Sequence, residues 1–126
     1  MRNSLLLWVS AILILMLPRC HDADEDTFSL KGVTTKVTGE NIVIENNHGS
    51  AISYFAAETE TLKTIRWTPV STADNTIASG SSKVVPWDDI VSKEMLQQGD
   101  QVIVHWWLAQ DSIATSPEIN RNPLTL

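Results

Sequence analysis

The chain has 126 residues, which is enough for one domain and too few for two ordinary ones. Its 15 acidic side chains outnumber the 9 basic ones and give a formal net charge of −6 at pH 7. Nucleic-acid binding needs a basic footprint, and anionic membrane surfaces attract clusters of Lys and Arg, so this balance disfavours both contacts. A single cysteine excludes an intramolecular disulfide.

The first residues have the organisation of a signal peptide. Arg2 and the α-amino group supply positive charge ahead of an uncharged run from Leu5 to Leu17. As a helix this run is about 20 Å long, short of the ~30 Å hydrocarbon core of a bilayer. Pro18 then interrupts the helix. These features predict a signal peptide over residues 1–19 and a domain outside the cytoplasm.

The only cysteine follows directly. Cys20 stands where bacterial lipoprotein precursors carry their lipid-accepting cysteine, and this segment resembles such a precursor. Leu17 matches the leucine usual three places before the cleavage site, whereas Arg19 replaces the usual Gly, Ala or Ser. The resemblance implies cleavage before Cys20, acylation with chains such as palmitate, and anchoring of the protein in the bacterial cell envelope. A conventionally cleaved signal peptide and an uncleaved short anchor are the alternatives.

Residues 20–30 are expected to form a tether. Asp22, Asp24, Glu25 and Asp26 place four carboxylates in five positions, in a run that repels itself and stays solvated. The run is similar to acidic stretches that follow the lipidated cysteine in surface-exposed lipoproteins of some Gram-negative bacteria. A calcium site is the alternative, but the spaced ligands and glycine of an EF-hand are missing.

Residues 31–126 are predicted to form one domain of short strands. Alternation of apolar and polar residues marks strands over 31–38, which is edge-like, and over 41–45 and 51–57. Asn46–Ser50 has the composition of a turn, which predicts that the second and third of these strands form a hairpin.

The middle of the domain mixes strands, loops and one helical stretch. Strands are predicted over 62–67, 75–78 and 84–85, the last two separated by a loop. Apolar residues near helical spacing predict a turn or two of helix within 88–98, with Asp88 as a possible N-cap and Gly99 just beyond the C-terminus.

The strongest strand signal lies near the C-terminus. Residues 101–109 are largely apolar on both faces, which predicts a central strand that is covered on both sides. Residues 110–126 are expected to hold one edge strand or a loose tail. Six or seven such strands favour an all-β antiparallel sandwich of immunoglobulin type. The stretch 42–107 is similar to small exported bacterial domains of uncharacterised function, which supports the fold alone.

The histidines do not make a catalytic or metal-binding pattern. His21 lies in the tether, His48 in a predicted turn and His105 in the central strand, with no nucleophile motif beside them. A metal site needs three or four converging ligands. We therefore expect no enzyme activity and no cofactor. His105 is expected to be a partly buried strand residue, with a role in ligand contact or pH sensing as the alternative.

Tryptophan is the most distinctive residue type. Trp106 and Trp107 are adjacent in one strand and therefore point to opposite faces. Trp106 is expected in the core. Trp107 is either covered by a second layer or exposed with Phe55, and with Tyr54 or Trp87, as an aromatic patch for a protein or a sugar.

These features predict a non-enzymatic, membrane-tethered binding module of the cell envelope. Its candidate contact residues are Trp107, Trp87, Phe55 and His105. A secreted inhibitor of a hydrolase, with loops 71–75 and 79–82 as its wedge, is the first alternative. An accessory structural subunit of an envelope complex is the second.

Overall fold

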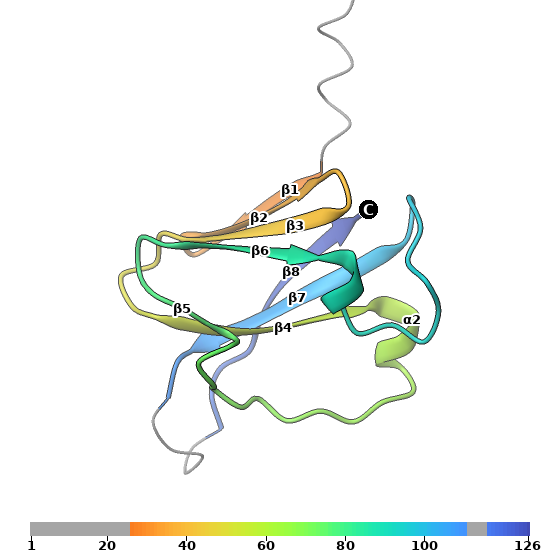
Figure 1. The fold of residues 1–126 in the computed structure, drawn as a ribbon. Coiled ribbons are helices and arrows are strands. Elements are labelled where there is room, and N and C mark those ends of the chain that lie inside the picture. Colours follow the sequence, from red (N-terminus) through yellow and green to blue (C-terminus); the bar gives the residue numbers. More distant parts are fainter. Residues whose placement is uncertain (1–25, 111–115) are drawn as a thin grey trace, which may run out of the picture.

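Two four-stranded sheets lie one above the other in the computed structural model, which describes residues 26–110 and 116–126 (Figure 1). Cys20, the predicted signal peptide and most of the predicted tether lie outside these residues. One sheet has the order β1-β2-β3-β6 and the other the order β5-β4-β7-β8, and every strand pair is antiparallel. The strands are β1 (Thr27–Leu30), β2 (Val33–Thr38), β3 (Asn41–Asn46), β4 (Ile52–Glu58), β5 (Thr76–Ile77), β6 (Ser82–Pro86), β7 (Gln101–Leu108) and β8 (Asn120–Thr125).

The alternation seen in the sequence sets the inner face of the first sheet. Val33 and Val37 of β2, and Ile42 and Ile44 of β3, are all buried, while the residues between them are more exposed or polar. Burial of such a side chain contributes about 1.5–3 kcal/mol. β2 was expected to be an edge strand, but it is not one, because β1 pairs along its outer side. The sandwich therefore begins at Thr27, within the segment assigned to the tether.

The central strand is confirmed. β7 pairs with β4 from Val102 to Leu108, and it pairs with β8 on its other side. Its inner face contributes Val102, Val104 and Trp106 to the core, and all three are buried. The C-terminal segment supplies β8 as the edge strand of this sheet.

The predicted hairpin between 41–45 and 51–57 is wrong. β3 and β4 belong to different sheets, and Asn46–Ser50 carries the chain from one to the other. The buried amide of Asn46 stabilises this crossing: its Nδ2 donates to the carbonyls of Ser50 at 3.0 Å and Ile77 at 2.9 Å. A turn-forming composition is compatible with either connection, so the local sequence did not distinguish them.

Two further predictions fail in the middle of the chain. Residues 62–67 are not a strand: helix α2 (Thr59–Leu62) leads into an irregular segment that runs to Asn75. The helix predicted within 88–98 is reduced to a 3-10 helix at Trp87–Asp89, with Pro86 rather than Asp88 as its N-cap. The helical spacing of these apolar residues is instead explained by core packing, because Ile90 is buried and Leu96 packs against the core.

The sandwich architecture is confirmed, with eight strands rather than six or seven. Immunoglobulin constant domains place their first, second, fifth and fourth strands in one sheet. Here the first sheet holds the first, second, third and sixth strands, so the connections differ from that order.

A buried asparagine links the two sheets. Asn122 of β8 donates from Nδ2 to the carbonyl of Val33 in β2 at 3.0 Å, and its Oδ1 accepts the indole N–H of Trp106 at 3.1 Å. Both polar ends of the amide and the indole donor are thereby satisfied without water.

Candidate interaction surface

An aromatic cluster covers the outer face of the second sheet. The ring of Trp67 stacks on Phe55 with centroids 4.6 Å apart and lies 4.8 Å from His105 and 5.9 Å from Trp107. Trp67 comes from the irregular segment after α2, which crosses this face. Three of the four predicted contact residues, Phe55, His105 and Trp107, therefore do lie together.

The cluster is a second core rather than an open patch. Trp107 is 2 % exposed and Trp106 is 1 % exposed, so both tryptophans of β7 are buried, one on each face. The exposed position considered for Trp107 is thus wrong. The covering layer is the segment that contains Trp67, which the sequence had placed in a strand.

Ser71 anchors this covering segment. Its Oγ lies 3.3 Å from the Trp107 indole nitrogen and 3.2 Å from the backbone nitrogen of Gln110, both of which donate to it. The buried hydroxyl of Ser53 also donates to it, at 2.8 Å. Ser71 is thus engaged with the sheet. Farther along the predicted wedge loop, Asn75 Oδ1 accepts from the backbone N–H and the hydroxyl of Thr72.

His105 is held within the aromatic cluster. Its Nδ1 lies 3.2 Å from the carbonyl oxygen of Phe55, and the residue is 4 % exposed. Burial lowers the pKa of His105, and the nearby charge of Arg121 acts in the same direction, while the Phe55 hydrogen bond opposes them. The neutral imidazole is the form that suits this apolar site.

Trp87 lies apart from the other three residues. It begins the 3-10 helix and packs, half-buried, against the inner core. Its indole nitrogen is shielded from solvent and has no hydrogen-bond partner in the part of the chain that the structure describes. An unpaired buried donor costs about 1–3 kcal/mol.

Among the described residues, the most exposed large apolar side chain lies in the loop that follows. Met95 is 87 % exposed and Val91 is 39 % exposed, whereas Ile90 and Leu96 of the same loop face the core. We call residues 90–100 the Met95 loop. Sequence reasoning missed it, because the same apolar residues were assigned to a helix.

Several hydrogen bonds hold the Met95 loop in place. Val91 extends the open side of β4, where its N–H donates to Ala56 and its carbonyl accepts from Glu58. The N–H of Lys93 donates to the hydroxyl of Thr61 in α2 at 3.1 Å. At the far end of the loop, the N–H of Gly99 donates to the C-terminal residue Leu126.

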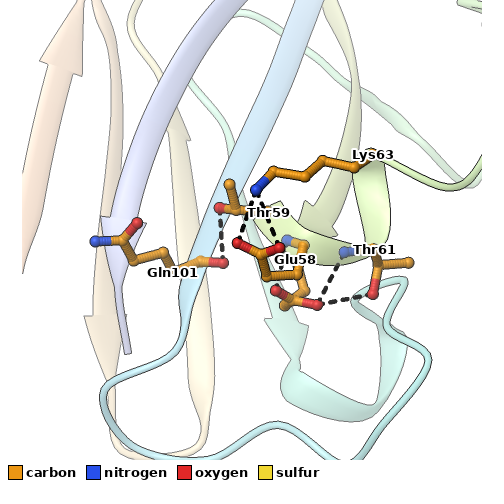
Figure 2. A network of polar contacts seen from close by, with 6 residues as sticks. Glu58, Thr59, Thr61, Lys63 and Gln101 are labelled. Atoms are coloured by element: carbon orange, nitrogen blue, oxygen red, sulfur yellow. Dashed lines mark hydrogen bonds and ion pairs between the residues drawn. The ribbon is translucent and has the colours of Figure 1, made fainter.

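The contact with α2 depends on one carboxylate. Glu58 caps the helix: its Oε2 accepts from the N–H of Glu60, and its Oε1 accepts from both the N–H and the hydroxyl of Thr61 (Figure 2). The Thr61 hydroxyl is therefore oriented to accept from Lys93. These hydrogen bonds, of which the Thr61 hydroxyl makes the largest contribution, lower the pKa of Glu58 and keep it ionised.

Two hollows flank Met95. One, of about 390 Å³, lies between the loop and the α2 end of the sheet and is lined by Glu58, Glu60, Thr61, Ser92, Lys93, Glu94, Met95, Gln97 and Asp100. The other, of about 420 Å³, lies towards the 3-10 helix and is lined by Glu40, Trp87, Asp88, Ile90, Ser92, Lys93, Glu94, Met95 and Leu96. Both volumes fall within the range of ligand-binding clefts. Met95 with these two hollows is called the Met95 surface.

Across residues 26–110 and 116–126, no three His, Cys, Asp or Glu side chains are grouped as they would be to hold a metal ion. No helix in these same ranges is long and apolar enough to cross a membrane.

The fold and this surface define the protein as a small antiparallel β-sandwich with a braced apolar loop. Comparison with models of protein families, with curated proteins and with solved structures gives no match.

Proposed function

We propose that this protein is a non-enzymatic interaction module of the bacterial cell envelope, tethered by a lipid on Cys20, which binds a protein partner through the Met95 surface. The observation that carries the proposal is the 87 % exposure of Met95 on a loop fixed at both ends by hydrogen bonds. Unbranched, polarizable methionine is well suited to protein contacts.

The exposed Met95 side chain gives a partner an apolar anchor on this surface. Covering an exposed Met or Val side chain contributes about 1.5–3 kcal/mol for a fully buried residue. Because the loop is already held by Ala56, Glu58 and Thr61, little ordering of the backbone is needed when a partner binds. The two flanking hollows provide a concave surface for a partner beside the apolar Met95 side chain. Phe55, His105 and Trp107, first considered for contact, instead pack on the sheet beside Trp67, whereas Trp87 lines one of the hollows beside Met95.

The proposed tether would determine which end of the sandwich lies near the membrane. Asp26 is bound to the sandwich through its carboxylate, which accepts from the N–H of Thr125 at 2.7 Å. Five residues lie between Cys20 and Asp26, and the six residue steps that join them span at most about 22 Å. A lipid on Cys20 would thus hold this end of the sandwich near the bilayer. The far end of the Met95 loop also meets the C-terminal residue, next to Thr125.

Photo-crosslinking in living cells tests the proposal. A photoreactive amino acid replaces Met95 in the full chain, and in a matched control it replaces Val84, which is 58 % exposed on β6. The proposal predicts one dominant protein adduct from position 95 and none from position 84. Equal adducts at both positions, or no adduct at position 95, would contradict it. A dominant adduct with a hydrolase that loses activity would favour the inhibitor alternative.

A further inference from the structure

The charges around Met95 are strongly unbalanced. Carboxylates from several elements line the two hollows, and Lys93 is the one basic residue in either lining. The acidic residues of the linings are Glu40, Glu58, Glu60, Asp88, Glu94 and Asp100. A concave surface lined by one sign of charge concentrates the field and attracts ions of the opposite sign.

Part of this charge is already engaged within the protein. Glu58 caps α2, Asp100 accepts from the N–H of Gln97 at 2.8 Å, and Glu60 pairs with Lys63 at 3.0 Å. The Glu60 pair is exposed on both sides and gives little stability, so it is easily exchanged for another cation.

Other carboxylates face solvent. Glu40, Asp88 and Glu94 are exposed, and Glu94 lies next to Met95 and lines both hollows. The carboxylates come from separate elements and, within the described residues, no three of them group as metal ligands. Their arrangement therefore fits several separate cationic groups better than one metal ion.

An apolar side chain between acidic hollows identifies the chemistry of its partner. Anionic lipid headgroups and acidic proteins would be repelled, whereas Lys and Arg side chains would pair with the carboxylates while an apolar neighbour covers Met95. A Lys or Arg side chain also carries an aliphatic stem that packs against apolar surface. Each hollow is large enough for one such side chain.

We infer that the Met95 surface binds a cationic protein segment in which Lys or Arg side chains flank at least one large apolar side chain. This inference rests on the proposed function, since it names the kind of partner that the same surface takes. The charge complementarity of the two hollows and the exposure of Met95 between them carry it.

Binding of a defined peptide tests the inference. The probe is a short synthetic peptide of Lys, Arg and Leu, and a peptide with Glu in place of Lys and Arg serves for comparison. The full-length chain, purified in detergent, is titrated by fluorescence anisotropy of the labelled peptides. We expect binding of the cationic peptide alone, weakened as ionic strength rises.

Two variants locate the binding. Glu94→Lys should weaken binding of the cationic peptide about tenfold or more, as should Met95→Ser, because each removes one part of the surface. Asp74→Lys makes the same change in charge on an exposed residue outside both hollows, and should change the affinity less than about twofold. In nuclear magnetic resonance spectra, the chemical-shift changes caused by the cationic peptide should centre on Lys93–Leu96.

The outcomes separate the two proposals. Equal weakening by Glu94→Lys and Asp74→Lys would mean diffuse attraction and would overturn the inference, as would equal binding of the acidic peptide. A dominant photo-crosslink at position 95 without binding of the cationic peptide would leave the proposed function standing and this inference wrong. Absence of that crosslink would count against the proposed function itself.

Discussion

Each of the adjacent tryptophans of β7 belongs to a separate packed layer. Trp106 lies between the sheets and Trp107 lies beneath the segment carrying Trp67. We expect Trp107→Ala to lower the free energy of unfolding by about 3–5 kcal/mol, as for a fully buried Trp, and Trp106→Ala to do the same. Urea denaturation measures both. Met95→Ala, at an exposed position, should change stability by less than about 0.5 kcal/mol. A loss below about 1 kcal/mol for Trp107→Ala would show that its cover is loose.

His105 gives the fold a dependence on pH. Its pKa in the folded protein lies below the usual value of about 6.5, chiefly through burial, so the unfolded chain binds the proton more readily. The contribution of the neutral imidazole is therefore fully present above pH 6.5 and is lost as pH falls below it towards the folded-state pKa. The pKa of Glu58 is also lowered, but its stabilising effect is lost only further down, below about pH 4.5.

Denaturation midpoints at pH 7.0 and pH 5.5 measure the histidine effect, since these values bracket the usual histidine pKa of about 6.5. The wild-type chain should lose stability between them, and His105→Gln should flatten the change. An unchanged profile in His105→Gln would assign the pH dependence to other groups.

The sequence placed Trp106 in the core but left Trp107 open between two environments. Alternation along a strand predicts that the two rings point to opposite faces, but it does not predict what covers each face. The cover comes from Trp67 and Ser71, which lie far from β7 in the chain and in no regular element. Long-range contacts of an irregular segment leave no periodic signal, so the burial of Trp107 was not predictable.

Among the elements, the turn between β1 and β2 depends on one glycine. Gly32 has φ of +87°, and a Cβ there would lie 3.1 Å from backbone atoms of Asn47 and His48. Gly32→Ala should therefore cost about 1–3 kcal/mol of unfolding free energy, from backbone strain and the close contact. Gly39→Ala is the matched control, since Gly39 has φ of +58° with nothing within 4 Å of a Cβ. In thermal denaturation, Gly32→Ala should lower stability clearly more than Gly39→Ala does. Equal losses of stability would contradict this role of Gly32 in the turn.

Helix α2 and the Met95 loop should loosen together. Thr61 is buried, and its hydroxyl donates to Glu58 and accepts from the N–H of Lys93. Thr61→Val keeps the shape of the side chain and removes both bonds, at a cost of about 1–3 kcal/mol. Hydrogen exchange should show loss of protection at the Lys93 amide, while amides of β7 change only as far as global stability does. Unchanged protection at Lys93 would mean that the loop is held in another way.

Elements with clear alternation were predictable, and elements shaped by tertiary contacts were not. β2, β3, β4 and β7 were located within one or two residues, because each has one face or both faces in the core. Residues 62–67 failed for the opposite reason: Ile65 and Trp67 alternate as in a strand, but they lie in a segment that crosses the sheet. The Met95 loop failed because Ile90 and Leu96 face the core at a spacing that imitates a helix.

At the scale of the whole molecule, both ends of the described chain and the Met95 loop meet. Asp26 binds Thr125, and Leu126 exchanges backbone hydrogen bonds with Gly99 and Asp100. The sequence predicted a sandwich from the number and spacing of strands, but not which strands share a sheet, since the pairing of β3 with β6 and of β4 with β7 joins distant residues. The candidate contact surface depends on that pairing, because it brings α2, the 3-10 helix and the loop to one side.

The proposed lipid anchor on Cys20 is tested most directly by the intact mass of the membrane-extracted protein from a bacterial host, beside its Cys20→Ser variant. The wild-type mass should equal residues 20–126 plus a diacylglycerol group and acyl chains, with the modification absent from the variant. An unmodified wild-type mass beginning at another residue would contradict the lipid anchor and release the sandwich from the membrane.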